Sequence, residues 1–239
     1  MGADPAMDSG PQEDIVEIAF RIAGGRIPTD HAWALRTAVV KILPWMENEV
    51  AAGIHPIRAA ASGNGWESPE DAPGQWLILS RRSSLKLRIP AHRVSEAMAL
   101  CGRRLELETS ELDIGEARVR PLEACPTLFA RHLLDEDTAN PKANEISADA
   151  DGEESFVARF RASIAAFTDR SPRLICGLRG RIKTPTGTLA TRSLLIADLG
   201  KDASIAIRKH GFEQNTLLGC GLFIPHKSID PIPNSSEER

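Results

Sequence analysis

Six histidines supply the side chains of this sequence that are best suited to proton transfer near neutral pH. His31 follows Asp30, a favourable helix N-cap, so we expect its ring in the partly exposed first turn of a helix, where the helix dipole favours a neutral imidazole. His55 lies in a strand-like run, three positions before Arg58. Both are candidate catalytic residues that could act as general acid or base, although either could be a structural histidine. Structural roles are expected for the other four, His92, His132, His210 and His226.

Basic side chains recur along the predicted strands and their turns, and several could face one side and contact phosphates. The alternative is an ordinary solvated sheet face. Tyrosine is absent and aromatic residues are few, so base stacking is poorly provided for, and shape and phosphate contacts would dominate any RNA binding. The candidate RNA-binding side chains are Arg58, Arg81, Arg82, Lys86, Arg179, Arg181, Lys183 and Arg192.

A glycine-rich stretch at 211–221 lies between a predicted helix and the last predicted strand. Gly211, Gly219 and Gly221 tolerate positive φ angles and let another backbone approach closely, which favours a shaped loop that holds a ligand. The simpler interpretation is a helix C-cap followed by a bulged strand start.

The net charge of −4 conceals an uneven distribution. Residues 135–154 carry eight acidic side chains against one lysine, whereas residues 155–228 carry twelve basic side chains against four acidic ones. The acidic stretch is typical of a solvated insertion, and the basic C-terminal part favours a polyanionic partner.

Several classes of protein are disfavoured by what the sequence lacks. No apolar run approaches the roughly 20 residues of a membrane span, and the N-terminus lacks the order of a signal peptide, so a cytoplasmic protein is expected. The four cysteines are scattered without metal-ligand spacing, and there is no P-loop, dinucleotide, zinc-protease or nucleophile-elbow motif. Any chemistry is therefore expected to proceed without a metal or another cofactor.

The elements that would position these residues appear in the same order twice. In the first half we expect strand 15–22, helix 30–43, strand 54–60, a long strand from 76–79 through 85–89, helix 94–101 and strand 105–107. In the second half we expect strand 128–134, a helix that carries Phe156, Phe160, Ile164 and Phe167 on one face, strands 174–183 and 189–199, helix 202–210 and strand 222–224.

Both halves therefore follow a β-α-β-β-α-β pattern. The predicted fold class is α+β, with two tandem ferredoxin-like (RRM-like) βαββαβ domains. We expect a disordered segment at 1–12, domains at 13–122 and 123–228, and a flexible tail at 229–239. The second domain would contain the acidic insertion 135–154 and the glycine-rich loop 211–221.

Five stretches, taken in this order, resemble the repeat-associated (RAMP) proteins of CRISPR systems. More narrowly, they resemble the CRISPR repeat-processing endoribonucleases of the Myxan-type group. The stretches are 27–35 (IPTDHAWAL), 43–45 (LPW), 53–57 (GIHPI), 85–90 (LKLRIP) and 219–227 (GCGLFIPHK). They span nearly the whole folded chain, and together they are more specific than any one of them alone.

The resemblance implies a metal-independent endoribonuclease that cleaves CRISPR repeat RNA on the 3′ side of a stem-loop. The 2′-hydroxyl next to the scissile phosphate would attack it, leaving 2′,3′-cyclic phosphate and 5′-hydroxyl ends. His31 would inherit the role of general acid or base, with His55 as the second candidate. Such proteins often stay bound to the mature crRNA as a subunit of a Cascade-like surveillance complex in the prokaryotic cytoplasm.

One feature departs from the family pattern. The glycine loop of relatives commonly carries arginine or lysine, whereas its interior here has no basic residue and one acid, Glu213. Backbone amides shaped by the glycines and arginines on the sheets would then have to contact the phosphates. Two alternatives stay open, a non-catalytic subunit that binds the crRNA stem-loop and a small-molecule-binding ferredoxin-like regulator unrelated to RNA.

Overall fold

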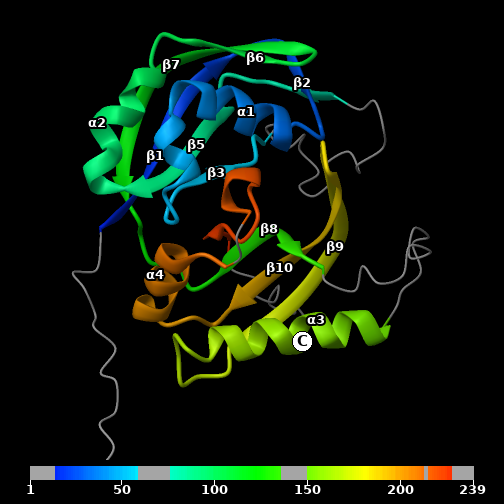
Figure 1. Ribbon diagram of the computed structural model, residues 1–239. Helices are drawn as coiled ribbons and strands as arrows, with labels where there is room; N and C mark the ends of the chain where they lie inside the picture. Colours follow the sequence, from blue (N-terminus) through cyan, green and yellow to red (C-terminus); the bar gives the residue numbers. More distant parts are fainter. Residues whose placement is uncertain (1–13, 59–75, 136–149, 213–214, 228–239) are drawn as a thin grey trace, which may run out of the picture.

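The computed structural model describes residues 14–58, 76–135, 150–212 and 215–227. Two α+β halves pack together, the N-terminal half above the C-terminal half in Figure 1. The chain passes from one half to the other between Pro121 and Leu128. The expected N-terminal segment 1–12, most of the acidic insertion and the tail 229–239 lie outside the described residues.

The N-terminal half is a five-stranded sheet in the order β3-β5-β1-β7-β6, with antiparallel pairing throughout. Helix α1 packs on one face of this sheet (Figure 1). β7 pairs with β1, β5 lies on the other side of β1, and β3 forms the edge, which is the order of a ferredoxin-like βαββαβ unit. The elements are β1 (Ile15–Ala23), α1 (Ala32–Ile42), β3 (Gly53–His55), β5 (Ser84–Pro90), α2 (Val94–Ala97), β6 (Arg104–Leu107) and β7 (Ser110–Pro121).

Two strand predictions for this half are wrong. The strand that completes the unit is β7, whereas the predicted last strand at 105–107 is only the hairpin partner of the first residues of β7. β7 was missed because its side chains beyond Ile114 are mostly exposed, so the alternation of a half-buried strand is lost.

Residues 76–78 are also not continuous with β5. They form β4 (Trp76–Ile78), which pairs with β2 (Arg26–Pro28) in a separate two-stranded sheet. A turn closed by Ser83 N–H donating to the Ser80 carbonyl separates β4 from β5.

Alternation along β1 and β5 sends apolar side chains to the face that α1 covers. Ile18, Phe20 and Leu87 are fully buried there beside Leu35 and Val39 of α1. Full burial of each such side chain contributes about 1.5–3 kcal/mol to the hydrophobic effect. The opposite face carries polar side chains of the same strands and packs against the C-terminal half.

The C-terminal half repeats the topology in a four-stranded sheet with the order β11-β8-β10-β9. Phe156, Phe160 and Ile164 of α3 are buried against this sheet as predicted, whereas α3 ends at Ile164 and Phe167 packs against the same core from beyond the helix. The two halves therefore confirm the fold class, tandem ferredoxin-like domains. The elements are β8 (Leu128–Leu134), α3 (Ala150–Ile164), β9 (Arg173–Thr184), β10 (Gly187–Ala197), α4 (Lys201–His210) and β11 (Ile224–Pro225).

The acidic stretch 135–154 was expected to be a solvated insertion, but both of its ends belong to the folded C-terminal half. Asp135 is buried at the end of β8, where its carboxylate lies 3.1 Å from Arg192 Nε and 3.6 Å from Arg179 Nε. At the other end, α3 begins at Ala150 and includes Glu153 and Glu154. Arg192 is buried and pairs with Asp135, so the Asp135 carboxylate does not face solvent. The charge count alone could not show this.

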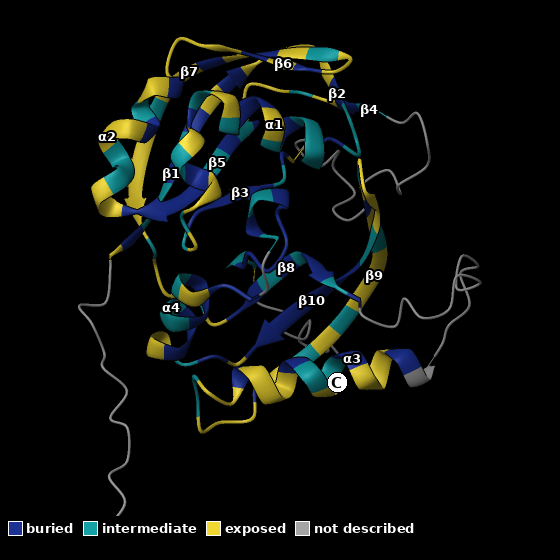
Figure 2. Cartoon of the chain, viewed as in Figure 1, coloured by how far each residue is buried: buried dark blue, intermediate teal, exposed yellow. Residues whose placement is uncertain are grey.

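The junction between the halves is buried, as Figure 2 shows for β3 and β8. Leu222 fills the space beside Gly53, and Thr216 Oγ1 donates a hydrogen bond of 2.7 Å to the Ala52 carbonyl. Across the described ranges, the helices are all too short or too polar to cross a membrane.

Candidate active site

His31 is the N-cap residue of α1, and its ring is held by backbone groups on both sides. Nδ1 lies 2.9 Å from the carbonyl oxygens of Pro28 and Thr29, and the Ile57 N–H donates to Nε2 at 3.0 Å. Because a carbonyl can only accept and an amide N–H can only donate, the ring is a neutral imidazole with its proton on Nδ1. The lone pair of Nε2 is therefore engaged by Ile57.

The expectation of a partly exposed His31 is wrong, because only 4% of the residue is exposed. The start of α1 packs against the C-terminal half, where Ala32 and Trp33 contact a small core that includes Ile182. Burial lowers the pKa of His31 and the nearby Arg131 charge adds to this, against the opposing effect of the two carbonyls. The neutral form expected from the sequence is thus produced mainly by burial.

The two halves gather four groups around this position, His31, Arg58, Arg131 and His132, which we call the His31 cluster. His132 Nδ1 lies 3.0 Å from Thr191 Oγ1, which orients the ring. Burial lowers the pKa of His132 to about 3, and Arg131, His31 and Arg58 act in the same direction. Two guanidinium groups beside two neutral imidazoles can stabilise developing negative charge and transfer protons.

Sequence reasoning missed two members of the His31 cluster. Arg131 was not singled out, and His132 was assigned a structural role in its strand. The available signal was the pair Arg131–His132 inside the otherwise apolar strand 128–134. Its meaning depends on how β8 meets α1, which only the docking of the halves decides.

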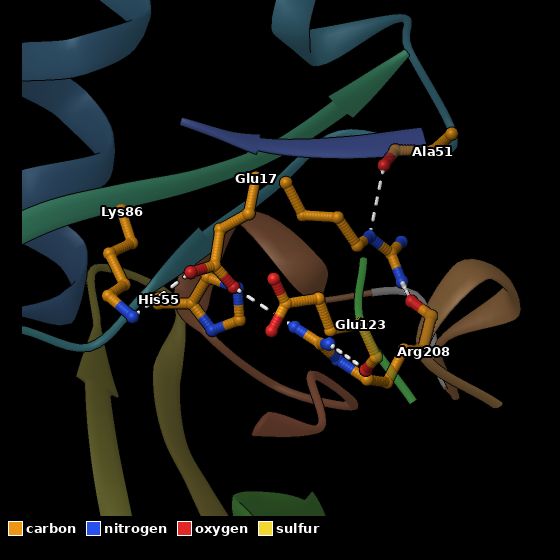
Figure 3. A network of polar contacts seen from close by, with 7 residues as sticks. Glu17, Ala51, His55, Lys86, Glu123 and Arg208 are labelled. Atoms are coloured by element: carbon orange, nitrogen blue, oxygen red, sulfur yellow. Dashed lines mark hydrogen bonds and ion pairs between the residues drawn. The ribbon is translucent and has the colours of Figure 1, made fainter. Parts of the chain in front are cut away.

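His55 lies elsewhere, on the face of the first sheet that meets the C-terminal half. Its Nε2 is 3.9 Å from Glu17 Oε2, and Lys86 Nζ lies 3.0 Å from the other oxygen of the same carboxylate (Figure 3). Burial lowers the pKa of His55 to about 3, and the facing Glu17 does not offset it. The structure does not bring His55 to His31, and its surroundings favour a structural role.

The carboxylate of Glu17 also joins the halves. Arg208 of α4 reaches it with Nη2 at 3.3 Å and donates from Nη1 to the Glu123 carbonyl at 2.8 Å (Figure 3). Arg88 donates to the carbonyls of Ala51 and Arg208, both at 3.2 Å. Burial acts to raise the pKa of Glu17, but the facing cations outweigh it and lower the pKa. We call Glu17, His55, Lys86, Arg88 and Arg208 the junction network.

The glycine-rich loop does not form an open cradle of backbone amides. Gly211, Gly219 and Gly221 are buried. All three have positive φ, and a Cβ would meet Arg88 at Gly211, Pro56 at Gly219 and a backbone carbonyl at Gly221. The N–H groups of these glycines donate within the protein, to Ile207, Thr216 and His132. Gly211 and Gly219 therefore permit close packing of the two halves, Gly221 permits a close backbone approach to Phe212, and the amides of all three are not free for phosphates.

The predicted RNA-binding side chains divide into exposed and engaged groups. Arg58, Arg81, Arg82, Arg181 and Lys183 are exposed. Lys86 pairs with Glu17, and Arg179 pairs with Asp135 while staying exposed. The prediction that Arg192 binds RNA is wrong, because this side chain is buried against Asp135 and Phe156.

The described residues contain no group of three or more His, Cys, Asp or Glu side chains that could hold a metal ion.

Two ferredoxin-like units pack against each other, with a glycine-rich loop and a histidine–arginine cluster at their junction, which is the architecture expected from the family resemblance. The family model described as Cas6 CRISPR matches residues 16–228. The chain belongs to the Cas6 family. The enzyme class predicted from the sequence, a CRISPR-associated endonuclease, is confirmed by this membership.

Individual relatives are distant in sequence. The chain is 24% identical over 215 residues to the CRISPR-associated endonuclease Cas6 of Myxococcus xanthus (strain DK1622), covering 88% of this chain and 81% of that protein. A solved Cas6-related protein from Pyrococcus furiosus has a TM-score of 0.55 at 13% identity, with 88% of this chain and 98% of that chain covered.

A solved RAMP protein binding different RNA substrates has a TM-score of 0.53 at 12% identity, with 87% of this chain and 98% of that chain covered. These structures share the tandem ferredoxin-like fold with this chain.

Proposed function

We propose that this protein is an endoribonuclease that cleaves CRISPR repeat RNA on the 3′ side of a stem-loop. The match of the Cas6 family model to residues 16–228 carries the proposal. The 2′-hydroxyl attacks the adjacent phosphate, so that the products end in a 2′,3′-cyclic phosphate and a 5′-hydroxyl. The reaction needs a base, an acid and stabilisation of the charge on the phosphorane, and no metal enters the proposed mechanism.

The His31 cluster supports this chemistry. Arg58 and Arg131 would bind the scissile phosphate, because guanidinium groups donate to two phosphate oxygens at once. One neutral imidazole, of His31 or His132, would accept the proton of the attacking 2′-hydroxyl, and the imidazolium so formed would donate that proton to the leaving 5′-oxygen. His132 replaces His55 as the second candidate, because its pKa responds to the charges of Arg131, His31 and Arg58.

The Ile57 N–H has to leave His31 Nε2 before that nitrogen can accept a proton. RNA bound at Arg58, the next residue along the chain, would pull on this amide. Catalytic hydrogen bonds are often rearranged in the substrate-free state, and a shift of residues 56–58 is enough to free the lone pair.

The stem-loop would contact the exposed basic side chains away from the cluster. Arg181 and Lys183 project from β9, whose far end lies beside α1, since the Lys183 N–H donates to Asp30 Oδ1 at 3.5 Å. Arg81 and Arg82 are exposed at the turn before β5. These side chains would supply the positive charge that the glycine loop lacks.

We further propose that the protein stays bound to the cleaved stem-loop and joins other subunits of a surveillance complex. The alternative function is a non-catalytic subunit that binds the crRNA stem-loop, and the buried, engaged ring of His31 is the observation that favours it.

Incubation with the cognate repeat RNA in EDTA tests the proposal. Wild-type protein should give a 2′,3′-cyclic phosphate end, and His31→Ala should cut at least about 100-fold more slowly. His92→Ala, a variant of an exposed histidine outside the cluster, is the control and should keep the wild-type rate. Binding without a cyclic phosphate product would instead support the non-catalytic alternative.

A further inference from the structure

Arg58 is held over an aromatic ring of the other half of the molecule. Its guanidinium carbon lies 5.4 Å from the centroid of the Phe129 ring, and the His226 ring lies 5.8 Å from the same centroid. Phe129 belongs to β8, and His226 directly follows β11. The Arg58 guanidinium lies over the Phe129 ring and the His226 ring is tilted by 48° to it, so the three side chains form one group, here called the stack, that crosses the junction of the halves.

This stack lies beside the candidate active site. Ile57, the neighbour of Arg58, donates to His31 Nε2, and desolvation together with the nearby charge of Arg131 lowers the pKa of Arg58 to about 10. Phe129 is two residues before Arg131 on β8, so the two side chains belong to one short segment of this strand. A nucleotide whose phosphate lies between Arg58 and Arg131 would have its base next to the stack.

The contacts of Arg58 leave its guanidinium group accessible to a ligand. No carboxylate of the described ranges pairs with Arg58, although many other arginines of this chain have such a partner. The residue is exposed, whereas Phe129 is half-buried beneath it. An aromatic ring orients a guanidinium without neutralising it, so its outer plane can still stack on a base.

We propose that Arg58 and Phe129 form a stacking shelf for the nucleobase next to the scissile phosphate. The proposal rests on the proposed function, because it takes the ligand of the His31 cluster to be RNA. It also revises the expectation that stacking is poorly provided for. One aromatic residue is enough here, because the planar guanidinium supplies the contact surface.

The test uses repeat RNA with a 2′-deoxy substitution that prevents cleavage and with 2-aminopurine next to the scissile phosphate. Stacking quenches 2-aminopurine fluorescence, so the shelf is observed directly in the bound state. Wild-type protein should quench strongly. The Arg58→Lys variant keeps the positive charge but lacks the planar guanidinium group. It should therefore lose most of the quenching and bind the RNA about 10-fold more weakly.

Arg26→Lys, an exposed arginine held over the Trp76 ring outside the candidate RNA-binding set, is the matched control and should leave both quantities unchanged. Phe129→Leu removes the support of Arg58 and should behave like Arg58→Lys, with a melting curve to show that the variant is folded. Full quenching by Arg58→Lys would overturn the shelf, as would RNA binding by wild-type protein without quenching.

The two proposals fail separately in this design. Strong quenching by wild-type protein that never cleaves unsubstituted RNA would refute the endoribonuclease and leave the shelf standing. Cleavage of unsubstituted RNA, with no quenching when the substituted RNA is bound, would refute the shelf and leave the endoribonuclease standing.

Discussion

Replacing Glu17 by glutamine tests whether the junction network holds the two halves together. The variant keeps the shape of the side chain and removes the only carboxylate that the network contributes. The Glu17 and Arg208 side chains are 12% and 5% exposed, so the variant leaves an uncompensated guanidinium in a buried position. Loss of one partner of a buried ion pair costs about 3–5 kcal/mol.

The lower end of that range applies here. Arg208 keeps its hydrogen bond to the Glu123 carbonyl, and the Lys86 side chain is 41% exposed and can turn to water. We therefore expect Glu17→Gln to lower the free energy of unfolding by about 3 kcal/mol. For a chain of this size, that corresponds to a fall in Tm of about 6–12 °C.

Urea and thermal unfolding at pH 7 measure this change, with Glu47→Gln as the matched control. Glu47 pairs with Arg36 at 2.8 Å, but its side chain is 49% exposed, so its loss should cost less than about 1 kcal/mol. Equal stability of the two variants would refute the reasoning, because burial would then have no influence on the pair.

The same carboxylate predicts a dependence on pH. Its pKa in the folded protein lies below the ordinary 4.5, so its stabilising contribution is present above about pH 4.5 and is lost as the pH falls through the folded pKa. In that window, Glu17→Gln should lose stability less steeply than the wild-type protein.

Three further predictions follow from particular side chains. His55→Gln should reduce the loss of stability between pH 6.5 and 5. Because His55 has a pKa of about 3 in the folded protein, its protonation in this range favours the unfolded chain by up to about 1.4 kcal/mol per pH unit. An unchanged slope of stability against pH in urea titrations would contradict this. Gly221→Ala should destabilise the protein by more than about 3 kcal/mol, since a Cβ there overlaps a backbone carbonyl, whereas Gly102→Ala has a similar φ and open space and should cost about 1 kcal/mol in the same unfolding assay. Arg181→Ala should reduce the salt dependence of RNA binding by about one phosphate contact without lowering Tm, whereas Arg192→Ala should lower Tm; the opposite pattern would show that Arg192 is the RNA contact.

Local pattern was enough to predict most of the fold. Alternation at 15–22 and the aromatic face of the second-half helix are set by residues close together in sequence, and the structure contains both. The first helix also forms where it was expected, although its N-cap is His31 rather than the predicted Asp30. β7 was not predicted. Its second half lies at an open edge of the sheet with mostly exposed side chains, so it lacks the apolar alternation that identifies a strand.

The site depended on contacts that no local pattern encodes. His31 could be selected from its position at a helix start, but its burial and its bond with Ile57 come from docking of distant segments. His55 was the second catalytic candidate from the sequence, whereas in the structure its ring on β3 faces Glu17. His132 and Arg131 reach the cluster only because the C-terminal half packs against the N-terminal half near His31.

The sequence by itself therefore determined the two ferredoxin-like units, the family resemblance and the first candidate histidine. The tertiary structure decided which charges are free and which are buried. Arg192 and Arg58 are both arginines in strand-like runs, yet one is buried beside Asp135 and the other is exposed over Phe129. The difference lies in what the opposite half of the molecule places against each side chain, which depends on long-range packing rather than on neighbouring residues.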